Sequence, residues 1–127
     1  MQGKHLYEYA VIRLVPKVER EEFFNVGIIL FSKRAKYIKA LYKVDENKLN
    51  LFSSELDRES LFANLHVFDK ICSGTKEGGP IAALDVPERF RWLTAVRSVS
   101  FQTSCPLPGF SVDLDQTLEI LFRELVL

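Results

Sequence analysis

The sequence lacks a net charge, because it holds 17 lysines and arginines against 17 aspartates and glutamates. Proteins that bind nucleic acid or anionic membranes without specificity carry an excess of positive charge over a large surface. The balance therefore argues against general nucleic-acid binding, although it leaves room for a local basic patch.

The sequence also lacks a long apolar run. The longest runs, such as Val26 to Phe31, are far shorter than the roughly 18 residues that a membrane helix needs. The N-terminal residues show no apolar segment typical of a signal peptide. We therefore expect a cytoplasmic protein that makes no membrane contact.

Residues that bind metals or act as nucleophiles are scarce. Cys72 and Cys105 are far apart, and neither His5 nor His66 belongs to a larger group of cysteines and carboxylates at metal-ligand spacing. A cysteine nucleophile would need a histidine base that the sequence does not place. Phosphate-binding loops, nucleophile elbows and dinucleotide fingerprints are missing too. We expect no metal site and no cofactor, with Cys72 in the core and His66 on the surface. A non-enzymatic role is favoured, and an enzymatic one stays open.

Three stretches in the first third of the chain predict strands. His5 to Pro16 alternates between apolar and polar residues, Phe23 to Ser32 is a nearly continuous apolar run, and Ala35 to Val44 alternates again. Pro16 is expected to end the pairing of the first strand. The short connections predict an antiparallel meander whose second strand is central and covered on both faces.

Helical patterns follow. The apolar stripe of Leu61, Leu65, Phe68 and Cys72 predicts a helix over residues 57–72, and residues 45–57 form a polar helical segment before it. Capping boxes at Asp85 and Asp113 predict two more helices, one ending near residue 95 and one reaching the C-terminus.

Residues 97–102 alternate as a fourth strand, whereas residues 103–109 contain two prolines and a glycine and predict a loop. The order β-β-β-α-α-β-α indicates the α+β class. We expect an antiparallel sheet of about four strands with the helices packed on one face. Since 127 residues suit one domain, residues 1–127 are predicted to form a single domain.

Polar residues inside the predicted strands are the first candidates for a site. Arg13 shares a strand face with Tyr7 and Tyr9, and Asn25 interrupts the apolar central strand. A buried amide without a partner costs about 1–3 kcal/mol, so Asn25 must find one. Gly27 allows a bulge or the close approach of another backbone or a ligand. Simple alternation places Asn25 and Gly27 on the same face of the strand.

Arginines near the third helix are the second group of candidates. Arg89 and Trp92 lie three residues apart on one side of a helix, and Arg97 begins the next predicted strand. Arginines beside an aromatic ring can bind a phosphate or a carboxylate with two hydrogen bonds. They could equally form structural ion pairs, or lie on the surface by chance. The carboxylates available for such pairs are Glu22, Asp85 and Glu88. We further hypothesise that Glu22 pairs with an arginine and fixes the start of the central strand.

Two blocks of sequence together resemble the bacterial family catalogued as domain of unknown function 3037. The first block is Tyr9-Ala-Val-Ile-Arg13, Pro16 and Glu22-Phe-Phe-Asn-Val-Gly-Ile-Ile-Leu-Phe31, and the second is Arg89-Phe-Arg-Trp-Leu-Thr94 followed by Arg97-Ser98. With the C-terminal Leu-x-x-Leu-Phe pattern, the resemblance covers essentially the whole chain. The positions that match the family pattern are Arg13, Glu22, Asn25, Gly27, Arg89, Trp92 and Arg97.

The resemblance implies a small bacterial cytosolic protein, often encoded beside a HipA-like kinase, and so an accessory protein that binds such a kinase. It implies no established biochemical activity. Many relatives carry a histidine just before the late Pro-Gly or Gly, where this sequence has Leu107-Pro108-Gly109. This departure argues against an enzymatic role.

Two functions therefore compete. The first is a protein-binding accessory module or assembly subunit, which should expose an apolar patch or a sheet edge. The second is a binder of, or enzyme for, a phosphate-bearing ligand such as a nucleotide or nucleic acid. There Asn25 would orient the ligand, and an arginine cluster would hold its charge. That cluster would comprise Arg13, Arg89, Arg91 and Arg97. The second function fails if the fold separates these side chains.

Overall fold

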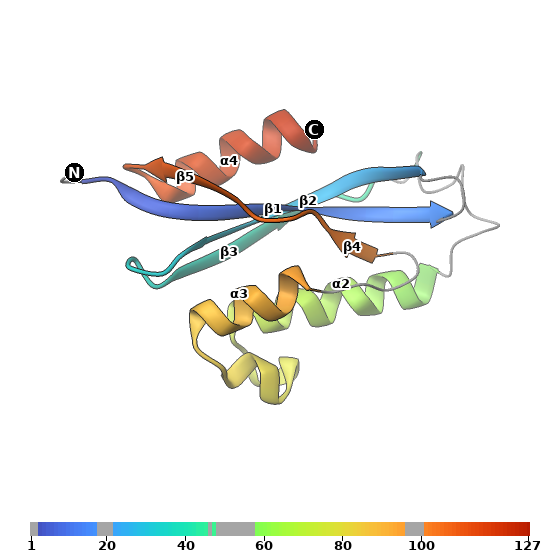
Figure 1. The fold of residues 1–127 in the computed structure, drawn as a ribbon. Coiled ribbons are helices and arrows are strands. Elements are labelled where there is room, and N and C mark those ends of the chain that lie inside the picture. The colour runs from blue at the N-terminus through green and yellow to red at the C-terminus, as the bar shows by residue number, and fades with distance from the viewer. Residues whose placement is uncertain (1–2, 18–21, 46, 48–57, 96–100) are drawn as a thin grey trace.

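The computed structural model describes residues 3–17, 22–45, 47, 58–95 and 101–127, and for residues 15–17, 22–24, 58 and 101 it describes the backbone alone. Figure 1 shows an elongated sheet between two layers of helix. The strands are β1 (His5–Lys17), β2 (Glu22–Ser32), β3 (Tyr37–Tyr42), β4 (Phe101–Thr103) and β5 (Leu107–Ser111). The α-helices are α2 (Arg58–Ser73), α3 (Val86–Thr94) and α4 (Leu114–Leu125), and the 3₁₀ helices are η2 (Lys76–Gly78) and η3 (Pro80–Ala83).

Within the described residues the sheet has five strands, and every pair is antiparallel. β3, β2 and β1 form the predicted meander, and β4 and β5 both pair with the other edge of β1. The prediction of a loop over residues 103–109 is wrong in its second half, because β5 begins at Leu107. An outer strand tolerates proline, and the ring of Tyr7 lies over Gly109.

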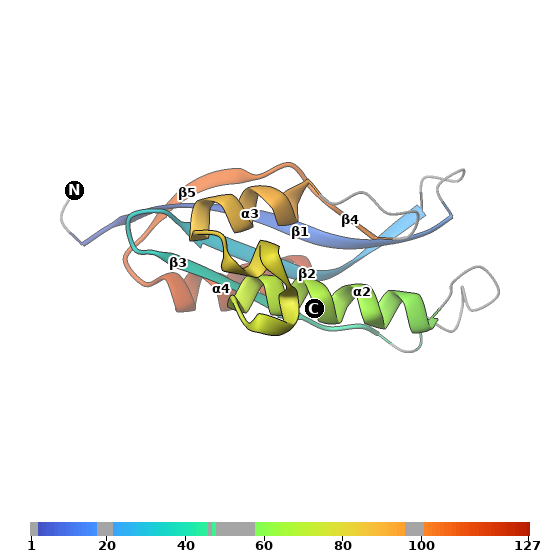
Figure 2. The same cartoon turned by 90° about the horizontal axis from the view of Figure 1, so that it is seen from below.

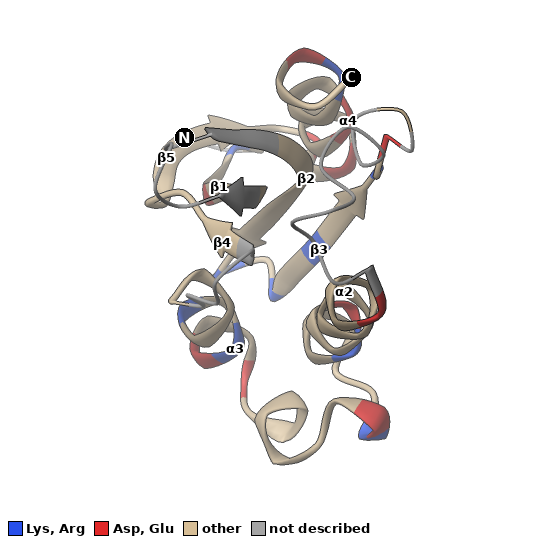
Figure 3. Ribbon diagram, turned by 90° about the vertical axis from the view of Figure 1, so that its right-hand side faces the viewer, with Lys and Arg blue, Asp and Glu red and all other residues tan. Residues whose placement is uncertain are grey.

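Helices cover both faces of the sheet, as Figure 3 shows, so the expected packing on one face is wrong. On one face α4 buries Leu114 and Leu118 against Val11, Ile28 and Leu30. On the other, α2 and α3 bury Leu61, Phe68 and Leu93 against Ala10, Ile12 and Ile29. We call these the α4 face and the α2–α3 face. Because β1 and β2 carry apolar residues on both faces, each face needs a layer to cover it. The α+β class itself is confirmed.

A β-bulge in β2 changes which side chains share a face. Ile12 lies opposite Gly27 and Arg13 lies opposite Asn25, which leaves Val26 as the extra residue. Val26 is buried in the core of the α2–α3 face, and Asn25 hydrogen-bonds to α4 on the other side. The prediction that Asn25 and Gly27 share a face is therefore wrong, because one inserted residue reverses the alternation.

The helix predictions within the described residues are confirmed. The Asp85 carboxylate accepts a hydrogen bond from the Glu88 backbone N–H at 3.1 Å, and Asp113 accepts one from Gln116 N–H at 3.1 Å. Most of the segment predicted as a polar helix over residues 45–57, and the start of the predicted fourth strand, lie outside the described residues. No helix in the described part of the chain is both long and apolar enough to span a membrane.

The N-terminal turn of α4 is fixed to β3 by one phenol. Tyr37 Oη donates to an Asp115 carboxylate oxygen at 2.7 Å, and Lys39 Nζ lies 3.6 Å from the same oxygen. The hydrogen bond from Tyr37 and then the Lys39 charge lower the pKa of Asp115. Burial and the neighbouring carboxylates raise the pKa of Tyr37. These contacts position α4 lengthwise over the sheet.

Candidate functional site

Arg13 and Asn25 lie together on the α4 face. Arg13 is opposite Asn25 on β2 and opposite Gln102 on β4, so the three side chains form a polar row across the sheet. Asn25 Nδ2 donates to the carbonyl oxygen of Leu125 at 2.8 Å. That carbonyl belongs to the last turn of α4, where the helix leaves its acceptors unpaired. Asn25 therefore fixes the end of α4 to the sheet.

Arg89 closes the C-terminus of α2. Its Nη1 donates to the carbonyl oxygens of Ile71 at 3.3 Å and Cys72 at 3.2 Å. Gly74, at φ 74°, reverses the chain there and its N–H donates to Ile71 at 3.2 Å. The guanidinium also lies at the negative end of the helix dipole. Arg89 thus joins α3 to α2 through backbone carbonyls, and no described carboxylate forms an ion pair with its guanidinium.

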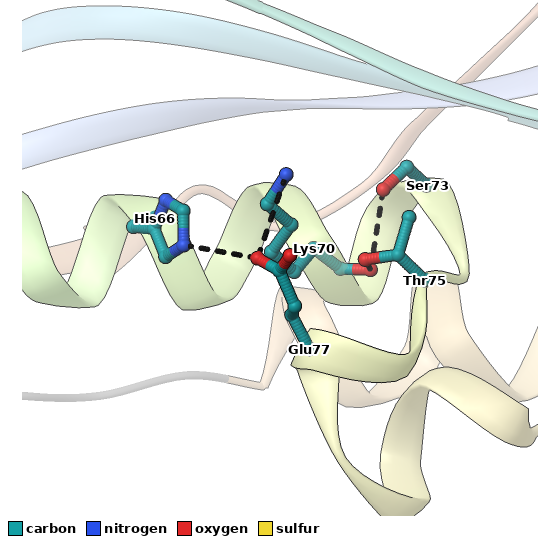
Figure 4. A network of polar contacts seen from close by, with 5 residues as sticks. All are labelled: His66, Lys70, Ser73, Thr75 and Glu77. Carbon is teal, nitrogen blue, oxygen red and sulfur yellow. Dashed lines mark hydrogen bonds and ion pairs between the residues drawn. The ribbon is translucent and has the colours of Figure 1, made fainter.

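Further polar contacts tie η2 to the same end of α2 (Figure 4). The hydroxyls of Ser73 and Thr75 donate to the Lys70 carbonyl at 3.3 and 3.4 Å. His66 Nε2 and Lys70 Nζ lie 3.5 and 3.8 Å from one Glu77 carboxylate oxygen. The imidazole is exposed, as the sequence predicts. These residues hold the η2 segment against the helix.

The candidate arginines that the structure describes do not all lie together. Arg13 belongs to the α4 face and Arg89 to the layer beneath the opposite face, so the sheet separates them. Trp92 is 44% exposed on α3. Arg97 and the side chain of Glu22 lie outside the described residues, so the pairing of Glu22 with an arginine stays a prediction. The clamp that would combine Arg13 with Arg89 is not formed.

Gly27 is explained by packing inside the sheet. A Cβ atom at this position would lie 2.6 Å from the backbone carbonyl oxygen of Leu41 on β3 and 3.1 Å from Ile12 Cδ1. The sequence prediction of a close backbone approach is confirmed, and the approaching backbone is that of the neighbouring strand.

Cys72 is poorly suited to act as a nucleophile in this fold. It is buried, and burial together with the nearby Asp69 raises the pKa of its thiol to about 12. At neutral pH the thiol is therefore protonated, and a thiol is a poor nucleophile compared with a thiolate. Among the residues that the structure describes, no three His, Cys, Asp or Glu side chains are grouped to bind a metal ion.

One end of the α2–α3 face is left uncovered by helices, as Figures 1 and 2 show near the N-terminus. The cross-strand pair of Leu6 on β1 and Phe110 on β5 lies there, and the two residues are 54% and 64% exposed. A hollow of ≈ 400 Å³ is bounded by this pair and by the β2–β3 turn, which contributes Lys33 and Arg34. We call this surface the open end of the sheet.

The open end is surrounded by positive charge. Two more hollows of ≈ 310 Å³ continue from it towards α3 and share Glu8, Phe31 and Lys33 in their walls. The basic side chains that line the three hollows are Lys4, Lys33, Arg34 and Arg91. Glu8 is the acidic residue lining them, and none of the four basic groups forms an ion pair with a described acidic side chain. The surface is therefore locally basic on a chain without net charge.

Sequence reasoning did not find this surface. Leu6 and Phe110 lie side by side only because β5 pairs with β1. The proline and glycine of β5 are typical of a loop, so the sequence does not predict this strand. The available signal was Phe110 next to Gly109, an aromatic residue that a polar loop does not require.

Comparison with protein families matches residues 9–126 to the family described as "Protein of unknown function (DUF3037)". Comparison with curated proteins finds no match, and comparison with solved structures finds none either. The match covers nearly all of the described fold, including both blocks that carry the sequence resemblance. The chain therefore belongs to the DUF3037 family, whose description assigns no function.

Proposed function

We propose that this chain is a non-enzymatic accessory module of the bacterial cytosol that binds another protein through the open end of its sheet. The observation that carries the proposal is the exposed Leu6–Phe110 pair, which lies among basic side chains that no described carboxylate pairs with. Contiguous exposed apolar surface with a polar rim is typical of protein interaction sites. The competing phosphate-ligand function rested on the arginine cluster, and the sheet separates Arg13 from Arg89.

The energetics favour Phe110 as the anchor of the interface. An aromatic side chain buries a large area at a low cost in conformational entropy, and such residues dominate binding energy at interfaces. Phe110 and Leu6 face the same side of adjacent strands, so a partner can bury both together. Burying the exposed part of each side chain stabilises a complex by about 1–2 kcal/mol.

Affinity purification of the tagged chain from its source cells, with mass spectrometry of the eluate, tests the proposal. We expect a stoichiometric partner, and the HipA-like kinase that the resemblance implies is the first candidate. The Phe110→Ser variant should retain about tenfold less of it. Phe62→Ser, which alters a phenylalanine 42% exposed on α2, is the matched control and should retain it fully. A partner that is retained equally by both variants, or no stoichiometric partner, would contradict the proposal.

A further inference from the structure

We infer that the partner covers the open end with an acidic amphipathic helix, an inference that rests on the proposed function. Three features of the open end support it. The outer edge of β5 offers few backbone hydrogen-bond donors, the sheet beside α3 is not covered by a helix, and the surrounding charge is positive.

The edge of β5 is a poor template for an added strand. The Ser104 N–H donates to the Val11 carbonyl at 2.8 Å, so the backbone N–H and C=O groups of Val11 point toward β4. Because these groups alternate in direction along a strand, those of Tyr7 and Tyr9 also point to this side, toward β5. By alternation along the β1–β5 ladder, the backbones of Pro108 and Phe110 turn outward. Pro108 has no N–H, so Phe110 supplies the outward donor along β5. Proline at an edge strand is a known means of preventing strand addition.

The open end of the α2–α3 face, by contrast, has room for one more helix beside α3. α2 and α3 cover the α2–α3 face elsewhere, and the layer stops beside the open end (Figures 1 and 2). Phe90 of α3 already stacks on Phe31, with ring centroids 4.7 Å apart, and Phe31 also lines the hollows beyond α3. A helix is about 10 Å wide, which covers two adjacent strands. A partner helix over β1 and β5 would extend the layer and bury Leu6 and Phe110.

The basic residues around the open end indicate which residues the partner helix should carry beside its apolar stripe. Lys4, Lys33 and Arg34 line the hollow that contains Leu6 and Phe110, and no described carboxylate neutralises them. A helix with an apolar stripe and glutamates on both sides of it would place each charge opposite a basic group. Complementary charge raises the association rate and excludes basic partners.

Binding of synthetic peptides to the full chain, measured by fluorescence anisotropy, tests this inference. The main probe is a labelled peptide of about 18 residues with leucines at helical spacing and glutamates between them. Three control peptides have the same residues in scrambled order, the same residues in strict alternation, and lysine in place of glutamate. The helical acidic peptide should bind about tenfold more tightly than each control, and rising salt should weaken its binding.

Variants of the chain locate the binding. Leu6→Ser and Phe110→Ser should each weaken binding of the helical acidic peptide about tenfold, with Phe62→Ser as the neutral control. Lys33→Glu should weaken it about fivefold, whereas Lys43→Glu, at an exposed position that does not line the hollows, should have no effect.

Four results would overturn the inference. The first two are that the alternating peptide or the scrambled peptide binds as tightly as the helical acidic peptide. The third is that an oligonucleotide displaces the labelled peptide at a lower concentration than unlabelled peptide does, and the fourth is that the chain forms a dimer that Phe110→Ser dissociates. If the purification shows a partner lost on Phe110→Ser while the helical peptide fails, this inference alone is wrong. If Phe110→Ser retains the partner, the proposed function is wrong as well.

Discussion

A Gly27→Ala substitution is expected to lower the free energy of unfolding by about 3 kcal/mol. The added Cβ would lie 2.6 Å from the Leu41 carbonyl oxygen, which is closer than nonbonded carbon and oxygen atoms approach. Because that oxygen belongs to the backbone of β3, a change of rotamer cannot relieve the contact. The strands must separate, and the hydrogen bonds between β2 and β3 weaken. Urea denaturation followed by circular dichroism measures the loss.

A double substitution shows which neighbour of Gly27 causes the effect. Ile12→Val removes the Cδ1 atom that would lie 3.1 Å from the new Cβ. If the backbone contact dominates, Gly27→Ala should be equally destabilising with valine or isoleucine at position 12. A double variant that regains most of the lost stability would show that side-chain crowding is responsible, contrary to this account.

An Arg89→Met substitution is expected to cost about 2 kcal/mol of stability, which lowers the melting temperature by roughly 5–10 °C. Methionine keeps the apolar stem and removes the guanidinium. The carbonyl oxygen of Cys72 then loses its donor, the Ile71 carbonyl keeps only the Gly74 N–H, and the helix loses the cation at its C-terminus. Differential scanning calorimetry measures the change.

Arg91→Met is the matched control for Arg89, since Arg91 is exposed on the same short helix. Its effect should stay within about 0.5 kcal/mol, as for most surface substitutions. If Arg89→Met were as mild as this control and instead abolished partner retention, Arg89 would be a binding residue rather than a cap.

Much of the fold could be predicted because the spacing of apolar residues along a strand or helix shows which of its faces is buried. The alternation in β1, the capping residues Asp85 and Asp113 and the apolar stripe of α4 all have local causes. The expectation of helices on one face is wrong, although the prediction that the second strand is covered on both faces already required a second layer over Val11, Ile28 and Leu30. The bulge at Val26 was missed for a different reason: an extra residue in a continuous apolar run leaves the composition unchanged.

The candidate site could be predicted only in part. The sequence predicts that Asn25 needs a hydrogen-bond partner, and it leaves Arg89 as an anion-binding residue, an ion-pair residue or a surface residue. In the structure both side chains donate to backbone carbonyls of distant helix ends. Sequence spacing cannot reveal such acceptors, because they depend on where α2 and α4 end in space. The open end depends in the same way on the pairing of β1 with β5, which brings residues from the two ends of the chain together.

The most direct test of the central claim is photo-crosslinking in the source cells with benzoylphenylalanine in place of Phe110. The same reactive group in place of Phe62 serves as the control, since both positions are exposed. The account predicts that position 110 crosslinks to a single protein, that mass spectrometry maps the adduct to an acidic segment of it, and that position 62 does not form this adduct. The same adducts at both positions, or none at position 110, would contradict the claim that the open end of the sheet is a docking surface.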